Sequence, residues 1–102
     1  MYETLKKVKP DDFATLDAAF DRWLSHQRLT KRQFNSEGRH PVEGKQILLM
    51  AFKAGMFRFY GSIFEIGGVE TFVIVNVDQK KQNKADPNVL ATSAKRVRRY
   101  IV

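Results

Sequence analysis

Three strand-like segments joined by glycine-containing turns constrain the fold of this chain more than any other feature. The segments cover residues 46–53, 56–66 and 70–79, and each carries a run of apolar side chains. The dipeptides between them, Ala54-Gly55 and Gly67-Gly68, are typical of two-residue hairpin turns. This part of the chain therefore predicts three consecutive antiparallel strands.

Amphipathic helices are predicted on both sides of these strands. Pro10-Asp11-Asp12 is a helix start signal, because proline and acidic side chains favour the first turn. The apolar stripe that follows, as far as about Gln27, consists of Phe13, Leu16, Phe20, Trp23 and Leu24. Near the other end of the chain, Asp86 is the expected N-cap and Pro87 the first helical residue. The inner stripe of this last helix consists of Val89, Leu90, Ala94, Val97 and Ile101.

The remaining segments carry weaker signals. Residues 1–9 are expected to form a short edge strand or an extended lead-in. Residues 28–44 are polar and interrupted by glycine and proline, which favours a long loop or a short helix around residues 31–36. The whole chain, 1–102, suits a single domain. We expect an α+β fold, with one or two N-terminal helices packed on a twisted antiparallel sheet of three to four strands, and a C-terminal helix.

Positive charge is concentrated in the C-terminal part of the chain. The net charge is +7, from 18 basic and 11 acidic side chains. Residues 78–102 carry seven basic and two acidic side chains, a net charge of +5, whereas residues 1–21 carry three basic and five acidic ones, a net charge of −2. This asymmetry favours a phosphate-rich partner, with nucleic acid first among them.

Several classes of site are not expected from the composition. The chain has no cysteine, so disulfides and thiolate metal sites are excluded, and the two histidines have no metal-ligand spacing. We therefore expect neither a metal nor a cofactor. No apolar run approaches the roughly 18 residues of a membrane span, and no secretory signal core is present. The default expectation is a cytoplasmic protein without a membrane partner.

Strand pairing predicts where basic side chains meet. Two-residue turns at 54–55 and 67–68 place residue 53 opposite 56, and residue 58 opposite 77. Because opposed residues share a face of the sheet, Lys53, Arg58 and Tyr60 fall on one face, joined by Lys81 through extension of the last strand. Lys53, Arg58 and Lys81 then converge at the end of the sheet away from Gly67-Gly68.

Two interpretations of this cluster remain open. Arg58 offers a planar fork for a phosphate, while the lysines supply mobile positive charge. Alternatively, Arg58 pairs with an acid such as Glu70 or Asp78, and the lysines are simply solvated. His40, in the polar segment before Pro41, is a further candidate that could reach an active site.

The stretch from Lys45 to Tyr100 resembles the RelE/ParE/HigB superfamily of toxins from bacterial toxin–antitoxin pairs. The matching features are the segments AFK (51–53), MFRFYG (56–61), FVIV (72–75), KKQNK (80–84) and AKRVRRY (94–100). The resemblance implies the α+β fold described above and a cognate antitoxin as partner. It also implies an endoribonuclease that cuts messenger RNA at the ribosome without a metal. In that reaction the ribose 2′-hydroxyl attacks the adjacent phosphate, while basic residues stabilise the developing charge.

The resemblance also suggests roles for individual residues. Arg58 would bind the scissile phosphate, and Lys53 and Lys81 would complete the catalytic set. The substrate-binding residues would be Lys80, Lys84 and Tyr60, with Tyr60 stacking on a base. Tyr100, within the predicted last helix, would be an acid–base or stacking group.

Two other functions remain open. The gyrase-inhibiting branch of the superfamily shares the fold without the ribonuclease chemistry, so the chain could instead bind a protein target. It could also be a basic nucleic-acid-binding accessory protein of a mobile element. The basic residues of the last helix, Arg96, Arg98 and Arg99, also have two interpretations: a solvated basic face, or a docking surface for an acidic antitoxin segment.

Overall fold

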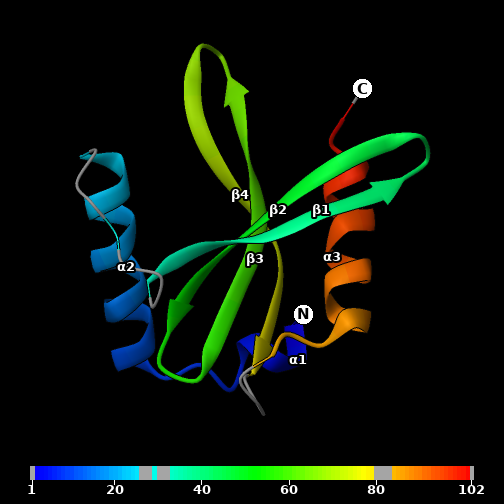
Figure 1. The fold of residues 1–102 in the computed structure, drawn as a ribbon. Helices are drawn as coiled ribbons and strands as arrows, with labels where there is room; N and C mark the ends of the chain where they lie inside the picture. The colour runs from blue at the N-terminus through cyan, green and yellow to red at the C-terminus, as the bar shows by residue number, and fades with distance from the viewer. Residues whose placement is uncertain (1, 26–28, 30–32, 80–83, 102) are drawn as a thin grey trace.

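The computed structural model describes residues 2–25, 29, 33–79 and 84–101, which form three helices and a four-stranded antiparallel sheet. The elements in chain order are α1 (Tyr2–Leu5), α2 (Pro10–Leu24), β1 (Phe34–Val42), β2 (Lys45–Ala54), β3 (Phe57–Ile66), β4 (Val69–Gln79) and α3 (Pro87–Arg98). Figure 1 shows α2 beside one face of the sheet and α3 beside the other. The expected α+β class, with N-terminal helices and a C-terminal helix, is confirmed.

Both long helices begin where the sequence predicts. Pro10 is the first residue of α2. The Asp86 side chain accepts a hydrogen bond of 2.8 Å from the backbone N–H of Asn88, so it caps α3, and Pro87 is the first helical residue. None of the helices in the described part of the chain is long and apolar enough to cross a membrane.

The sheet is a meander with strand order β1-β2-β3-β4. Ile66 pairs with Val69, which confirms the turn at Gly67-Gly68. The other predicted turn is wrong by one residue, because Ala54 pairs with Phe57 and the turn consists of Gly55 and Met56. Gly55 has a φ of 58°, and a tight hairpin needs this left-handed backbone at its first central position. Glycine adopts that backbone without strain, whereas Ala54 would not.

Two predictions for the N-terminal half are wrong. Residues 34–42 form strand β1 instead of a loop or a short helix, and part of the expected helix lies outside the described residues. Glycine and proline counted against a strand there, but β1 is an edge strand, where both are tolerated. Its register is irregular between Ser36 and Arg39. Residues 2–5 form the short helix α1 in place of the edge strand or extended lead-in expected within residues 1–9.

A β-bulge divides the β3–β4 hairpin. Gly61 pairs with Ile74 but Tyr60 pairs with Asn76, so Val75 is an extra residue on β4. The bulge changes which side chains share a face beyond it. Arg58 therefore lies opposite Asp78, and the predicted pairing of residue 58 with residue 77 is wrong.

Each face of the sheet has its own hydrophobic core. The α2-side core consists of Val8, Leu16, Ala19, Phe52, Ala54, Phe57, Phe59 and Val77. The α3-side core consists of Ile47, Leu49, Ala51, Tyr60, Val75, Ala94 and Val97. The bulge fixes α3 to the sheet, because Arg96 donates a 3.0 Å hydrogen bond to the Val75 carbonyl and Asn76 donates one of 3.0 Å to Ser93. One sheet thus supports helices on both faces.

Candidate nucleic-acid interface

The structure brings Lys53 and Arg58 together, as the sequence predicts. They are directly opposed on β2 and β3, and Tyr60 follows on the same face. Asp78 lies opposite Arg58 on β4, so Arg58 stands between a lysine and an aspartate. We call these four residues the Arg58 cluster. Lys80 and Lys81, the other basic residues predicted for this site, lie outside the described residues.

The Arg58 cluster lies on the face against which α3 packs, and its central side chains are buried. Arg58 is 5% exposed and Tyr60 is fully buried within the α3-side core. A nucleobase therefore has no access to the Tyr60 ring in this conformation. Burial raises the pKa of the Tyr60 hydroxyl above its usual value, and the neighbouring Arg58 guanidinium lowers it by less. Tyr60 is consequently a neutral core residue at physiological pH.

The strand register also shows which of the two acids predicted as partners of Arg58 lies near it. Asp78 shares its face as a cross-strand neighbour, an arrangement in which opposite charges stabilise a sheet. Glu70 lies opposite Glu65, near the tip of the β3–β4 hairpin, and is far from Arg58 along the strand.

The acid–base candidates lie at the other end of the sheet. Tyr100 follows the end of α3 at Arg98 instead of lying within the helix, is 59% exposed, and contacts Phe64 with ring centroids 6.4 Å apart. Phe64 is six residues from Arg58 along β3, which corresponds to about 20 Å. His40 pairs with Ile47, six residues from Lys53 along β2, and its Nε2 lies 2.9 Å from the Glu37 carbonyl oxygen. Neither candidate adjoins Arg58.

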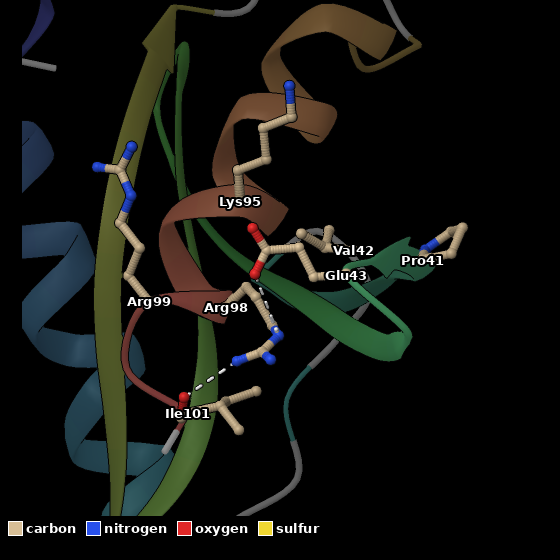
Figure 2. A pocket seen from close by; sticks show the side chains of 7 residues that line it. All are labelled: Pro41, Val42, Glu43, Lys95, Arg98, Arg99 and Ile101. Carbon is tan, nitrogen blue, oxygen red and sulfur yellow. Dashed lines mark hydrogen bonds and ion pairs between the residues drawn. The ribbon is translucent and has the colours of Figure 1, made fainter.

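A hollow of about 590 Å³ lies between the β1–β2 turn and the last turn of α3. We call it the α3 groove (Figure 2), and its lining residues are Pro41, Val42, Glu43, Lys95, Arg98, Arg99 and Ile101. Among the described residues, three cations and one acid line it. The contribution of this turn was not predicted, although the acidic residue followed by glycine at Glu43-Gly44 is similar to a hairpin-turn dipeptide. Both residues have positive φ, 48° and 79°, as in the type I′ hairpin turns that Asn-Gly and Asp-Gly favour.

The cations of the α3 groove differ in what they contact. Arg98 is engaged within the protein, because it donates a 3.0 Å hydrogen bond to the Ile101 carbonyl and its Nε lies 4.0 Å from Glu43 Oε2. Figure 2 shows the Arg99 guanidinium pointing away from the Glu43 carboxylate. Lys95 and Arg99 are exposed, and within the described part of the chain neither forms an ion pair. These two side chains are therefore available to an anionic partner.

A second hollow, of about 370 Å³, adjoins the same end of the helix. We call it the edge hollow, and it is lined by Ile74, Val75, Arg96, Arg99 and Tyr100. Arg99 lines both hollows, so they form one basic surface around the end of α3. The helix contains no acidic residue, and its C-terminal dipole favours the cations gathered there.

Comparisons with family models, with curated proteins and with solved structures found no match to this chain. Any function must therefore be inferred from the residues of the site themselves. In residues 2–25, 29, 33–79 and 84–101, no three His, Asp or Glu side chains lie close enough together to hold a metal ion. Lys84 is exposed in the connector before α3.

Proposed function

We propose that this protein binds nucleic acid through the α3 groove. One observation carries the proposal: Lys95 and Arg99, four residues apart at the end of α3, line an open hollow and form no ion pair among the described residues. Like charges at this spacing repel one another by a few tenths of a kcal/mol. A phosphate between them removes that repulsion, and the arginine fork matches its geometry.

The charge distribution supports a polymeric anion over a small one. Four cations, Lys95, Arg96, Arg98 and Arg99, lie within five consecutive residues, and the net charge of the chain is +7. Such a concentration attracts a phosphodiester backbone over long distances and gains affinity from the release of its counterions. A small anion would engage only one of the two hollows.

The test is the salt dependence of binding to a labelled oligonucleotide, measured by fluorescence anisotropy. Lys95→Gln combined with Arg99→Gln removes two phosphate contacts, so the slope of log affinity against log salt should become shallower by about 1.5. Lys7→Gln combined with Arg22→Gln is the matched control, because it removes the same charge from exposed positions that line neither hollow. Equal losses in both double variants, or no binding at low salt, would overturn the proposal.

A second candidate is the ribonuclease toxin that the resemblance implies, acting on messenger RNA at the ribosome and held by a cognate antitoxin. The observation in its favour is the direct opposition of Lys53 and Arg58 on one face. In this mechanism Arg58 would bind the scissile phosphate, with Lys53 and Lys81 stabilising the developing charge and Lys80 and Lys84 holding the RNA backbone. Because Arg58 is only 5% exposed, the reaction requires this face to open.

Expression in bacteria distinguishes these functions. A ribonuclease toxin should arrest growth and leave cut messenger RNA, and Arg58→Lys should relieve the arrest because it keeps the charge but loses the fork. Circular dichroism of the purified variant should match that of the unmodified protein, which separates relief of the arrest from loss of the fold. Growth arrest with intact messenger RNA and damaged DNA would instead indicate a protein target of the gyrase type. Harmless expression with salt-dependent binding would indicate an accessory nucleic-acid-binding protein.

A further inference from the structure

Tyr100 presents an exposed aromatic ring just beyond the end of α3. The residue is 59% exposed, and its backbone N–H donates a 2.9 Å hydrogen bond to the Val97 carbonyl, which fixes its position after the helix. The ring of Phe64, from β3, lies beside the Tyr100 ring, with centroids 6.4 Å apart and planes inclined by 55°. An aromatic side chain that is held in place but largely uncovered is a surface on which a planar ligand can stack.

The edge hollow beside this ring combines apolar and cationic walls. Ile74 and Val75 of β4 supply the apolar part, and Arg96 and Arg99 supply the positive charge. Arg96 is held at the wall because it donates a 3.0 Å hydrogen bond to the Val75 carbonyl. Among the described residues, no acid lines this hollow. Its volume of about 370 Å³ falls within the range of roughly 300–1,000 Å³ that is typical of small-ligand sites.

Arg99 connects the edge hollow to the α3 groove, because its side chain lines both. Figure 2 shows its guanidinium directed away from Glu43 and toward β4, the strand that supplies a wall of the edge hollow. A phosphate on Arg99 therefore has Lys95 in the groove on one side and Tyr100 in the hollow on the other. Since a base is joined to its phosphate through the sugar, the base can enter the hollow while the phosphate stays on Arg99.

We propose that this site selects single-stranded nucleic acid, with one base stacked on Tyr100 in the edge hollow and the adjoining phosphate on Arg99. The inference rests on the proposed binding of nucleic acid at the α3 groove and adds the form of the strand. Stacking on an aromatic ring tolerates any sequence, because every base has a π-face. In a duplex each base is already stacked and paired, so its extrusion costs free energy. The ring of Tyr100 is sufficient, and its hydroxyl is not required.

An abasic oligonucleotide separates stacking from phosphate contacts. A labelled oligothymidylate and an abasic DNA strand of equal length carry the same phosphates, so the ratio of their affinities, measured by fluorescence anisotropy, reports the contribution of the bases. The full chain should bind the strand with bases about tenfold more tightly. Tyr100→Ala should bring this ratio close to one and leave the slope of log affinity against log salt unchanged, because the ring contacts no phosphate.

Two further variants identify the group responsible. Tyr100→Phe keeps the ring and should keep the ratio. Phe13→Ala removes a ring on α2 that is 40% exposed and lines neither hollow, and it should also keep the ratio. If Tyr100→Phe loses as much as Tyr100→Ala, the hydroxyl is the group in use, and if Phe13→Ala loses as much, the effect is not specific to the edge hollow. Either result overturns the stacking.

The strands themselves separate a failure of this inference from a failure of the proposed function. If neither strand binds at low salt, the proposed function fails and this inference fails with it. If both strands bind equally, and Lys95→Gln with Arg99→Gln still makes the salt slope shallower, the α3 groove remains the contact and the stacking is overturned. A duplex of equal length that competes as well as the single strand also overturns it. The same strands made from ribonucleotides show whether RNA or DNA is preferred, and Tyr100→Ala should lower the ratio for both.

Discussion

Basic side chains lie near both ends of the sheet on its α3 side, but the two groups differ in their exposure to a partner. At one end, Arg58 is opposed to Lys53 and Asp78 and is 5% exposed. At the other end, Lys95 and Arg99 are exposed beside an open hollow. Positive charge beside a sheet is therefore not in itself a binding site. A partner can bind only basic side chains that it can reach, and the exposure of each side chain follows from how it packs against the rest of the fold.

The largest effect is expected at the glycine that lies between the two ends. A Cβ at Gly61 would overlap the Val73 carbonyl group across the strand pair. Gly61→Ala should therefore destabilise the protein by about 3 kcal/mol or more, because the backbone must move to relieve the overlap. Urea unfolding measures the loss. Gly67→Ala is an informative comparison, since its Cβ meets open space and only its positive φ of 59° causes strain. A smaller loss for Gly61→Ala than for Gly67→Ala would contradict the close packing at the bulge.

Truncation of an arginine at each end tests the difference in burial. Arg58→Ala should cost about 2–4 kcal/mol, because it removes buried packing and leaves neighbouring polar groups in the interior without a partner. Arg99→Ala should change the free energy of unfolding by less than about 0.5 kcal/mol, as is usual for an exposed surface residue. Equal losses in urea unfolding would show that the two ends do not differ as described.

Removal of the acid from the α3 groove should strengthen binding. Glu43 is the acidic member of the groove and lies 4.0 Å from Arg98. Glu43→Gln removes a repulsive charge worth up to about 1 kcal/mol near a bound phosphate, so affinity for an oligonucleotide should rise up to about fivefold at low salt. The gain should shrink as salt is added. Asp17→Asn on α2 is the control for a loss of negative charge elsewhere, and a gain of equal size there would show that the groove is not the contact.

The smallest expected effect is the pH dependence of stability that the buried Tyr60 contributes. Because burial raises the pKa of Tyr60, the folded state keeps its hydroxyl protonated where the unfolded chain begins to ionise, near pH 10. The stabilisation from this group is complete below that pH and is lost as pH rises through the higher pKa of the folded state. Unfolding midpoints of the unmodified protein should therefore fall more steeply above pH 10 than those of Tyr60→Phe. Parallel curves would contradict the burial of this hydroxyl.

Local signals in the sequence predicted much of the fold. Asp86-Pro87 capped α3, Gly67-Gly68 formed a turn, and the apolar stripe of the last helix packed on the sheet as expected. Each of these features depends on residues that are close together in the sequence, so a short stretch of sequence is enough to predict it. Strand β1 was missed because the tolerance of an edge strand for glycine and proline depends on its place in the sheet.

The features of the candidate site also separate into those that local sequence predicts and those that depend on the whole fold. The sequence by itself determined that Lys53 and Arg58 share a face, because a tight turn and the two-residue period of strands require it. The sequence also determined that four cations lie at the end of the last helix. Only the tertiary structure decided that a bulge at Val75 sets Asp78 against Arg58, and that Glu43 and the end of α3 enclose a groove. Those outcomes depend on packing between segments that are distant in the sequence, 20 residues apart for Arg58 and Asp78 and 55 for Glu43 and Arg98. Packing energies are summed over contacts that no local pattern records.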